Sequence, residues 1–213
     1  MSSFLNALLV SVLLLNFLAL GTSRIRSLIN AAAAQGILLG IMPFFIHPEF
    51  RFQTLAIAIA TIALKGIAIP QMLFKALRDA QIKREVEPLI GTLPTMLLGA
   101  LGAAAAMALT AWLPLASQQA ELLIIPASFT TILTGFLLLT TRIKAISQAT
   151  GYLILENGIF IFGLLLLDAM PFLVEAGVLL DLFAGIFVIS IIINHINREF
   201  ASLDTRRLTS LKD

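Results

Sequence analysis

Long apolar runs follow one another along the chain, separated only by short polar or charged stretches. Cutting the sequence at charges, prolines and polar clusters leaves seven candidate spans: 4–22, 27–46, 52–74, 89–113, 121–140, 146–167 and 172–194. Each span is long enough to cross the hydrocarbon core of a bilayer as a helix. None shows the alternation of apolar and polar residues that is typical of a membrane β-strand. The pattern therefore predicts an all-α integral membrane protein with about seven transmembrane helices.

The composition of the chain agrees with this pattern. Of its 213 residues, 59% are hydrophobic and only 12% are charged, whereas a soluble globular domain carries about 25% charged residues. The mean hydropathy is +1.01. These values exclude a soluble globular protein. The chain has no Cys, which excludes disulfides and thiolate-bound metal clusters.

The basic residues lie almost entirely in alternate loops. Twelve of the fourteen Lys and Arg residues follow the first, third, fifth and seventh spans: Arg24, Arg26, Lys75, Arg78, Lys83, Arg84, Arg142, Lys144, Arg198, Arg206, Arg207 and Lys212. Lys and Arg in short loops mark the cytoplasmic side of a membrane. We therefore expect the N-terminus outside and the C-terminus in the cytoplasm, with a short cytoplasmic surface helix near residues 75–88.

The two halves of the chain are alike in outline. Each has a helix ending at basic residues, a helix with a polar group before Gly, and a helix with an ionisable residue near its middle. This outline predicts a 3+1+3 arrangement, which has a three-helix unit over 1–76, a linker and fourth helix over 77–120, a second three-helix unit over 121–197 and a tail over 198–213. True duplication and a likeness of composition alone both remain open.

Four ionisable residues fall inside the predicted spans. Lys65, Glu156 and Asp181 lie near the middle of their spans, and Glu175 lies nearer the outer end of the seventh. A charge in the bilayer is costly, so such residues normally face a protein interior and mark ion or proton pathways. The alternative is that they form buried ion pairs that only hold the helices together. Gln35 is of interest because it occupies the place in the first half that Glu156 occupies in the second.

Other features of the spans predict packing rather than chemistry. Asn30, Gln35, Gln148 and Asn157 are expected to hydrogen-bond between helices, as such side chains commonly do in membranes. Pro70 falls five residues after Lys65 and is expected to loosen the backbone beside it. We find no Gly-rich phosphate loop, zinc-protease motif or nucleophile elbow, so catalysis by this chain alone is not expected.

The most distinctive sequence stretches lie in the second half of the chain. The stretches ENG, MPFLVEAGVLLDLFAG and LDTRRLTSLKD resemble the membrane subunit family known as hydrogenase-4 component E. Proteins of that family occur in formate-hydrogenlyase-type complexes and related group 4 nickel–iron hydrogenase assemblies. The likeness extends over essentially the whole chain.

Within that family, the second half is similar to subunit K of respiratory complex I, a three-helix protein with two mid-membrane glutamates. Glu156, which follows basic residues, and Asp181, four residues before Gly185, match those two positions. The resemblance implies that both belong to a buried charged axis that passes protons. Gln35 and Lys65 hold the corresponding places in the first half, which departs from the two-carboxylate pattern. Lys65 is expected to be a positive partner in that axis.

The resemblance implies a non-catalytic subunit in the cytoplasmic (inner) membrane of a bacterium or archaeon. Its expected partners are antiporter-like subunits, a membrane-anchor subunit and a peripheral hydrogenase module. The nickel–iron centre and iron–sulfur clusters are expected in those partners, with no cofactor in this chain. A net charge of only +2 gives no reason to expect a nucleic-acid partner. Two alternatives remain open: the small subunit of a multisubunit cation/proton antiporter, and a stand-alone transporter.

Overall fold

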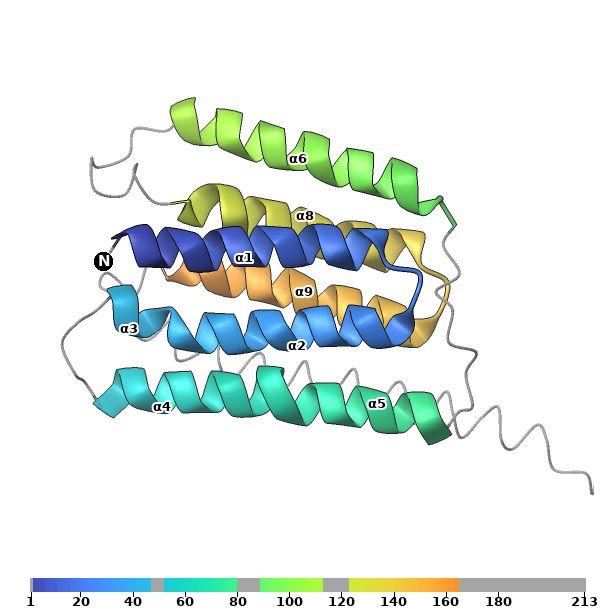
Figure 1. Cartoon of the computed structure of the whole chain (residues 1–213), viewed down its shortest axis with the longest axis horizontal. Coiled ribbons are helices and arrows are strands. Elements are labelled where there is room, and N and C mark those ends of the chain that lie inside the picture. The colour runs from blue at the N-terminus through green and yellow to red at the C-terminus, as the bar shows by residue number, and fades with distance from the viewer. Residues whose placement is uncertain (1, 47–51, 80–88, 113–122, 165–213) are drawn as a thin grey trace, which may run out of the picture.

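A computed structural model describes residues 2–46, 52–79, 89–112 and 123–164, and these ranges contain helices and no β-strand. The helices form a bundle with their long axes side by side (Figure 1). In chain order they are α1 (Ser2–Gly21), α2 (Ile25–Ile41), α3 (Pro43–Ile46), α4 (Phe52–Thr61), the π-helix η1 (Ile62–Ala68), α5 (Ile69–Asp79), α6 (Thr92–Trp112), α8 (Ile124–Thr141) and α9 (Ala145–Gly163).

Five helical segments are long and apolar enough to cross a membrane: Ser3–Gly21, Ile25–Phe45, Ala58–Arg78, Thr92–Trp112 and Ile124–Thr141. They correspond to the first five of the seven predicted spans. The sixth predicted span forms the 19-residue α9, which is less apolar because it contains Gln148, Glu156 and Asn157. The seventh predicted span, with Glu175 and Asp181, lies outside the described residues, as do 80–88 of the predicted surface helix.

Successive long helices run in opposite directions, so their connections gather at the two ends of the bundle. The turn between α1 and α2, the end of α5, the start of α6 and the turn between α8 and α9 lie at one end (Figure 1). Six basic residues lie at or near this end, which we call the basic end: Arg24, Arg26, Lys75, Arg78, Arg142 and Lys144. The seventh described basic residue is Lys65 in the middle of η1. The sorting of charge is the one expected from the positive-inside pattern.

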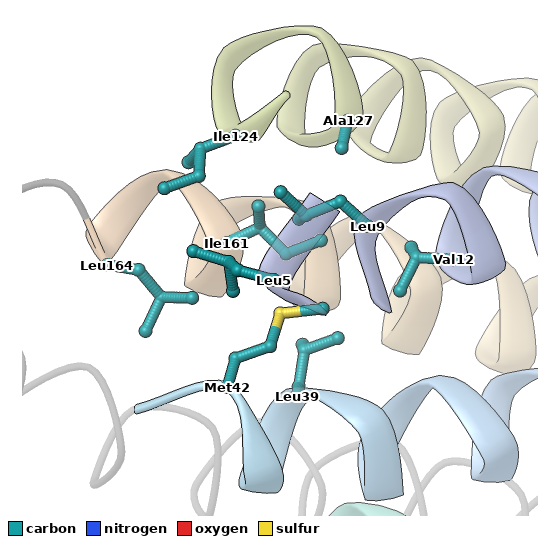
Figure 2. Packing of buried hydrophobic residues seen from close by; sticks show 9 residues of the cluster. All are labelled: Leu5, Leu9, Val12, Leu39, Met42, Ile124, Ala127, Ile161 and Leu164. Carbon is teal, nitrogen blue, oxygen red and sulfur yellow. The ribbon is translucent and has the colours of Figure 1, made fainter. Parts of the chain in front are cut away.

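Apolar side chains fill the interior in three clusters. One lies away from the basic end and joins α1, α2, α8 and α9 through Leu5, Leu9, Val12, Leu39, Met42, Ile124, Ala127, Ile161 and Leu164 (Figure 2). A second joins the same four helices nearer the basic end through Ala19, Leu20, Leu28, Ala31, Ala32, Leu138 and Ile154. The third joins α2, α5 and α9. Helices from both predicted three-helix units therefore share one core.

Glycines allow the closest helix contacts. A Cβ atom added at Gly135 of α8 would lie 2.6 Å from the carbonyl oxygen of Gly151 in α9. One added at Gly158 of α9 would lie 2.6 Å from the backbone nitrogen of Ile132 in α8. Real Cβ atoms do not approach backbone this closely, so α8 and α9 pack backbone to backbone. Small residues commonly permit such contacts between membrane helices.

Candidate functional site

Lys65 lies in a widened turn of helix. It is at the centre of η1, and the N–H of Ile69, which follows η1, donates to the carbonyl oxygen of Leu64, five residues earlier. Pro70 has no N–H to donate to Gly66, and its ring would crowd that carbonyl group in a regular α-helix. The wider turn accommodates the proline, as expected from its spacing from Lys65. Short π-helical segments of this kind are rare and are frequent at functional sites.

The Lys65 side chain is directed into the bundle. It is 7% exposed, and its Nζ lies 5.6 Å from the centroid of the Phe160 ring on α9. An ammonium group near an aromatic face is stabilised by about 0.5–2 kcal/mol, more as water is excluded. The Lys65 backbone is in contact with α2, because a Cβ atom added at Gly36 of α2 would lie 2.7 Å from the carbonyl carbon of Lys65. Gly36 therefore lets α2 pack directly on the Lys65 backbone.

Glu156 is buried on the same part of α9. It is 5% exposed and lies four residues before Phe160, so the two residues are one turn apart on one face of the helix. Lys65 packs on Phe160, and the structure therefore directs Lys65 and Glu156 toward the same interior region between η1 and α9. The sequence predicted both residues as buried charges near mid-membrane, and both are buried.

Gln35 joins this region through the residue next to Glu156. The Nδ2 of Asn157 donates a hydrogen bond to Oε1 of Gln35 at 3.3 Å. Gln35 is fully buried and precedes Gly36, which packs on Lys65. Three of the five predicted site residues therefore lie in one region, although they belong to different helices: Lys65 to η1, Gln35 to α2 and Glu156 to α9. The other two, Asp181 and Glu175, lie outside the described residues.

The contact between Asn157 and Gln35 is one link in a hydrogen-bonded chain that crosses four helices. Gln35 Nε2 donates to Asn16 Oδ1 at 2.8 Å, and Asn16 Nδ2 donates to Thr131 Oγ1 at 2.8 Å. Thr131 Oγ1 in turn donates to the carbonyl oxygen of Ala127 at 2.6 Å. The donors all point the same way, from α9 through α2 and α1 to α8. We call the four side chains of Asn157, Gln35, Asn16 and Thr131 the amide chain.

The amide chain forms a polar layer between apolar ones. On α1, Asn16 lies between Val12 of the cluster in Figure 2 and Ala19 of the next cluster. On α9, Asn157 lies between Ile154 and Ile161 of the same two clusters. Polar side chains at this depth are costly unless they are hydrogen-bonded. Their bonding therefore fixes how the four helices are rotated relative to one another.

Sequence reasoning missed Asn16 and Thr131 as members of this layer. One sequence feature could have indicated Asn16: it is the only Asn or Gln side chain between Ala7 and Gly21 in the first apolar run. Gln35 and Asn157 were expected to hydrogen-bond between helices, and they do so with each other. Pattern alone did not identify the partners, because these depend on the rotation of each helix.

Arg142 is also buried, which its predicted role as a topology marker did not anticipate. It is 1% exposed, and its Nη2 donates to the carbonyl oxygen of Leu20 near the end of α1 at 2.9 Å. Its Nε and Nη1 have no hydrogen-bond partner among the described residues. Burial lowers the pKa of the Arg142 guanidinium, but a guanidinium stays charged at neutral pH. A fixed positive charge therefore lies inside the basic end.

The side chains of this region differ in the chemistry that they offer. Within the described ranges, His, Cys, Asp and Glu side chains do not gather in groups of three or more. Neutral amides donate and accept hydrogen bonds but do not take up protons near neutral pH. Glu156 and Lys65 are the ionisable side chains in this region.

Comparison with known proteins relates the chain to a mycobacterial protein. No family model and no solved structure matches the chain. The chain is 32% identical over 194 residues to the uncharacterized protein Rv0085 of Mycobacterium tuberculosis (strain ATCC 25618 / H37Rv). The aligned residues cover 89% of this chain and 87% of that protein. A match of this identity over nearly the full length of both proteins implies a common fold. The chain therefore belongs to the same family as the uncharacterized protein Rv0085.

Proposed function

We propose that this protein is a non-catalytic membrane subunit of a complex I-like, membrane-bound hydrogenase assembly of the formate-hydrogenlyase type. In this proposal it contributes Lys65 and Glu156 to a path for H⁺ or Na⁺ that is driven by redox chemistry in other subunits. One observation carries the proposal: two ionisable side chains of opposite charge type are buried in neighbouring helices and directed to one interior region. Buried ionisable residues in membrane helices are commonly parts of ion or proton pathways.

The physical step is a change in proton affinity. A charge that moves close to Glu156 favours one protonation state of its carboxyl group, and a change of one pKa unit corresponds to about 1.4 kcal/mol. In an apolar interior such interactions are much stronger than in water. A redox event in a partner that shifts charge along the axis can therefore load or unload a proton at Glu156, with Lys65 as the positive group nearby.

The remaining parts of the proposal rest on the resemblance. Asp181 and Glu175 would continue the charged axis beyond α9. Antiporter-like subunits and a membrane anchor would flank the protein, and the nickel–iron centre and iron–sulfur clusters would belong to the peripheral partners. The membrane would be the cytoplasmic (inner) one, with the basic end facing the cytoplasm.

The proposal is tested by changing Glu156→Gln in the assembled complex and measuring ion uptake by membrane vesicles during electron transfer. Glutamine keeps the shape of the side chain but cannot carry a proton. We expect ion uptake to fall by at least about tenfold, because a positioned proton-transfer group commonly contributes a factor of 10² or more. Asp79→Asn is the matched control, since Asp79 ends α5 at the basic end.

Two results would contradict the proposal. Unchanged ion uptake with Glu156→Gln, in a complex that retains all its subunits, would remove Glu156 from the path. Equal losses in Glu156→Gln and Asp79→Asn would show that any lost carboxylate has this effect.

A further inference from the structure

A groove of about 610 Å³ opens on the surface of the bundle beside the end of α1. Its lining comes from the last turns of α1, the turn that leads into α2, and the first turn and a half of α6: Phe17, Leu18, Gly21, Thr22, Ser23, Arg24 and Met96. Its volume falls within the roughly 300–1,000 Å³ that is typical of small-ligand sites. None of these residues belongs to the buried charged region or to the amide chain.

The lining changes character along the groove. Phe17, Leu18 and Met96 lie in segments that are apolar enough to span the membrane, and Leu18 is 52% exposed. Thr22, Ser23 and Arg24 lie in the connection between two such segments, which end at Gly21 and begin at Ile25. The groove therefore runs from the hydrocarbon depth of the membrane to its boundary.

The polar end of the groove is suited to an anion. Arg24 is exposed there and directly precedes α2, and its side chain makes no capping hydrogen bond to this helix. The first backbone N–H groups of a helix point outward and favour negative charge, most often phosphate. Behind the wall, the buried Arg142 bonds the carbonyl oxygen of Leu20, the residue before Gly21. Two guanidinium groups and a helix N-terminus thus add positive potential at this end.

We propose that this groove binds an anionic phospholipid. One acyl chain would lie against Phe17, Leu18 and Met96, and the headgroup phosphate would lie at Arg24, Ser23 and the start of α2. A phospholipid is the occupant because the groove joins an apolar wall to a cationic rim at a membrane boundary. Basic pockets between transmembrane helices are known to bind such headgroups. An anionic headgroup is favoured because Arg24 lines the groove and the buried Arg142 lies behind its wall.

The proposal is tested with the full-length protein in mild detergent, by native mass spectrometry with added phosphatidylglycerol or phosphatidylcholine of equal chain length. We expect phosphatidylglycerol to bind more tightly. Arg24→Gln should weaken this binding about fivefold, since one basic residue near an anionic surface contributes about 1 kcal/mol. Arg26→Gln is the matched control because Arg26 is also exposed, two residues further along the chain, and is outside the lining.

A second pair of variants tests the apolar wall. Leu18→Trp should fill the groove and weaken binding, whereas Leu14→Trp should not, because Leu14 is 65% exposed one turn earlier on α1 and is outside the lining. The proposal fails if both lipids bind equally to the unaltered protein, if Arg24→Gln and Arg26→Gln weaken binding equally, or if Leu18→Trp leaves binding unchanged. Displacement of the lipid by inorganic phosphate at equal concentration would also overturn it, because the apolar wall would then contribute nothing.

Discussion

Asn157 Nδ2 donates a hydrogen bond to Gln35 Oε1 although 122 residues separate them in the sequence. Gln35 lies on α2 and Asn157 on α9, so the bond joins helices from the two halves of the chain. The bond also brings Glu156 close to Lys65. Glu156 directly precedes Asn157, and Gly36, which directly follows Gln35, packs on the Lys65 backbone. The amide chain therefore positions the residues on which the proposed ion path depends.

Replacing Gln35→Leu should destabilise the protein. Leucine is similar in size but leaves Asn16 Oδ1 and Asn157 Nδ2 without their partner, at a cost of about 1–3 kcal/mol in the free energy of unfolding. Unfolding in mixed micelles of a mild and a denaturing detergent measures this change in the free energy of unfolding. Gln71→Leu is the control, since Gln71 is exposed on α5, and its effect should stay within about 0.5 kcal/mol. Equal effects of the two changes would contradict the role given to the amide chain.

The same chain predicts that neighbouring changes are not additive. In the double variant Gln35→Leu with Asn157→Leu, the second substitution removes a donor that the first has already left unpaired. The double variant should therefore lose about 0.5–3 kcal/mol less stability than the sum of the two single variants. A double-mutant cycle on unfolding free energies measures the difference. Simple additivity would mean that the two side chains do not interact.

Gly135→Ala should weaken the contact between α8 and α9. Its added methyl group would lie 2.6 Å from the Gly151 carbonyl oxygen, and overpacking of this kind costs about 1–3 kcal/mol. Gly163→Ala is the control, because a Cβ atom there meets none of the described residues within 4 Å. The control should be neutral or slightly stabilising, since alanine favours helix. Thermal unfolding in detergent gives the comparison, and an equal drop for both variants would refute the backbone contact.

Pro70→Ala should convert the widened turn at Lys65 toward α-helix. Alanine supplies an N–H for the Gly66 carbonyl oxygen and removes the ring that crowds it. Narrowing the turn would rotate Lys65 away from Phe160 and lower coupled ion uptake without loss of the protein from the membrane. Pro126→Ala should leave uptake unchanged, because Pro126 is in the first turn of α8, where its N–H would have no partner within the helix. Full uptake in Pro70→Ala would show that the widened turn is dispensable.

Lys65→Met should lower coupled ion uptake by at least about tenfold, while Lys65→Arg should retain part of it. Methionine preserves the length and apolar stem of the side chain, whereas arginine keeps the positive charge. Ion uptake by vesicles during electron transfer is the measurement, with subunit content checked alongside. If both variants retain all subunits and full uptake, the positive charge at this position has no part in ion movement.

Much of the helical layout could be predicted because bilayer thickness sets the length of an apolar run. The predicted span 4–22 corresponds to α1 (Ser2–Gly21), and 89–113 corresponds to α6 (Thr92–Trp112). Pro70 likewise indicated a disturbed backbone beside Lys65, since a proline disturbs the helix one turn before it. These features depend on local sequence alone.

The partners inside the bundle could not be predicted in the same way. Asn16 bonds to Gln35 and Thr131 because three helices present these residues to one another. That relationship depends on helix rotation and on the close approaches that glycines permit, which spacing along the chain does not reveal. Arg142 is the clearest case. Its position after a span predicted a basic residue in a cytoplasmic loop, and packing against the end of α1 buries it.

The most direct test of the proposed function is the identity of the proteins that remain bound when this chain is purified from its native membrane in mild detergent. We predict recovery of antiporter-like membrane subunits together with nickel–iron and iron–sulfur proteins. Recovery with antiporter subunits alone would contradict a redox-driven assembly. Purification of the chain by itself, with solute transport in proteoliposomes, would contradict a subunit role altogether.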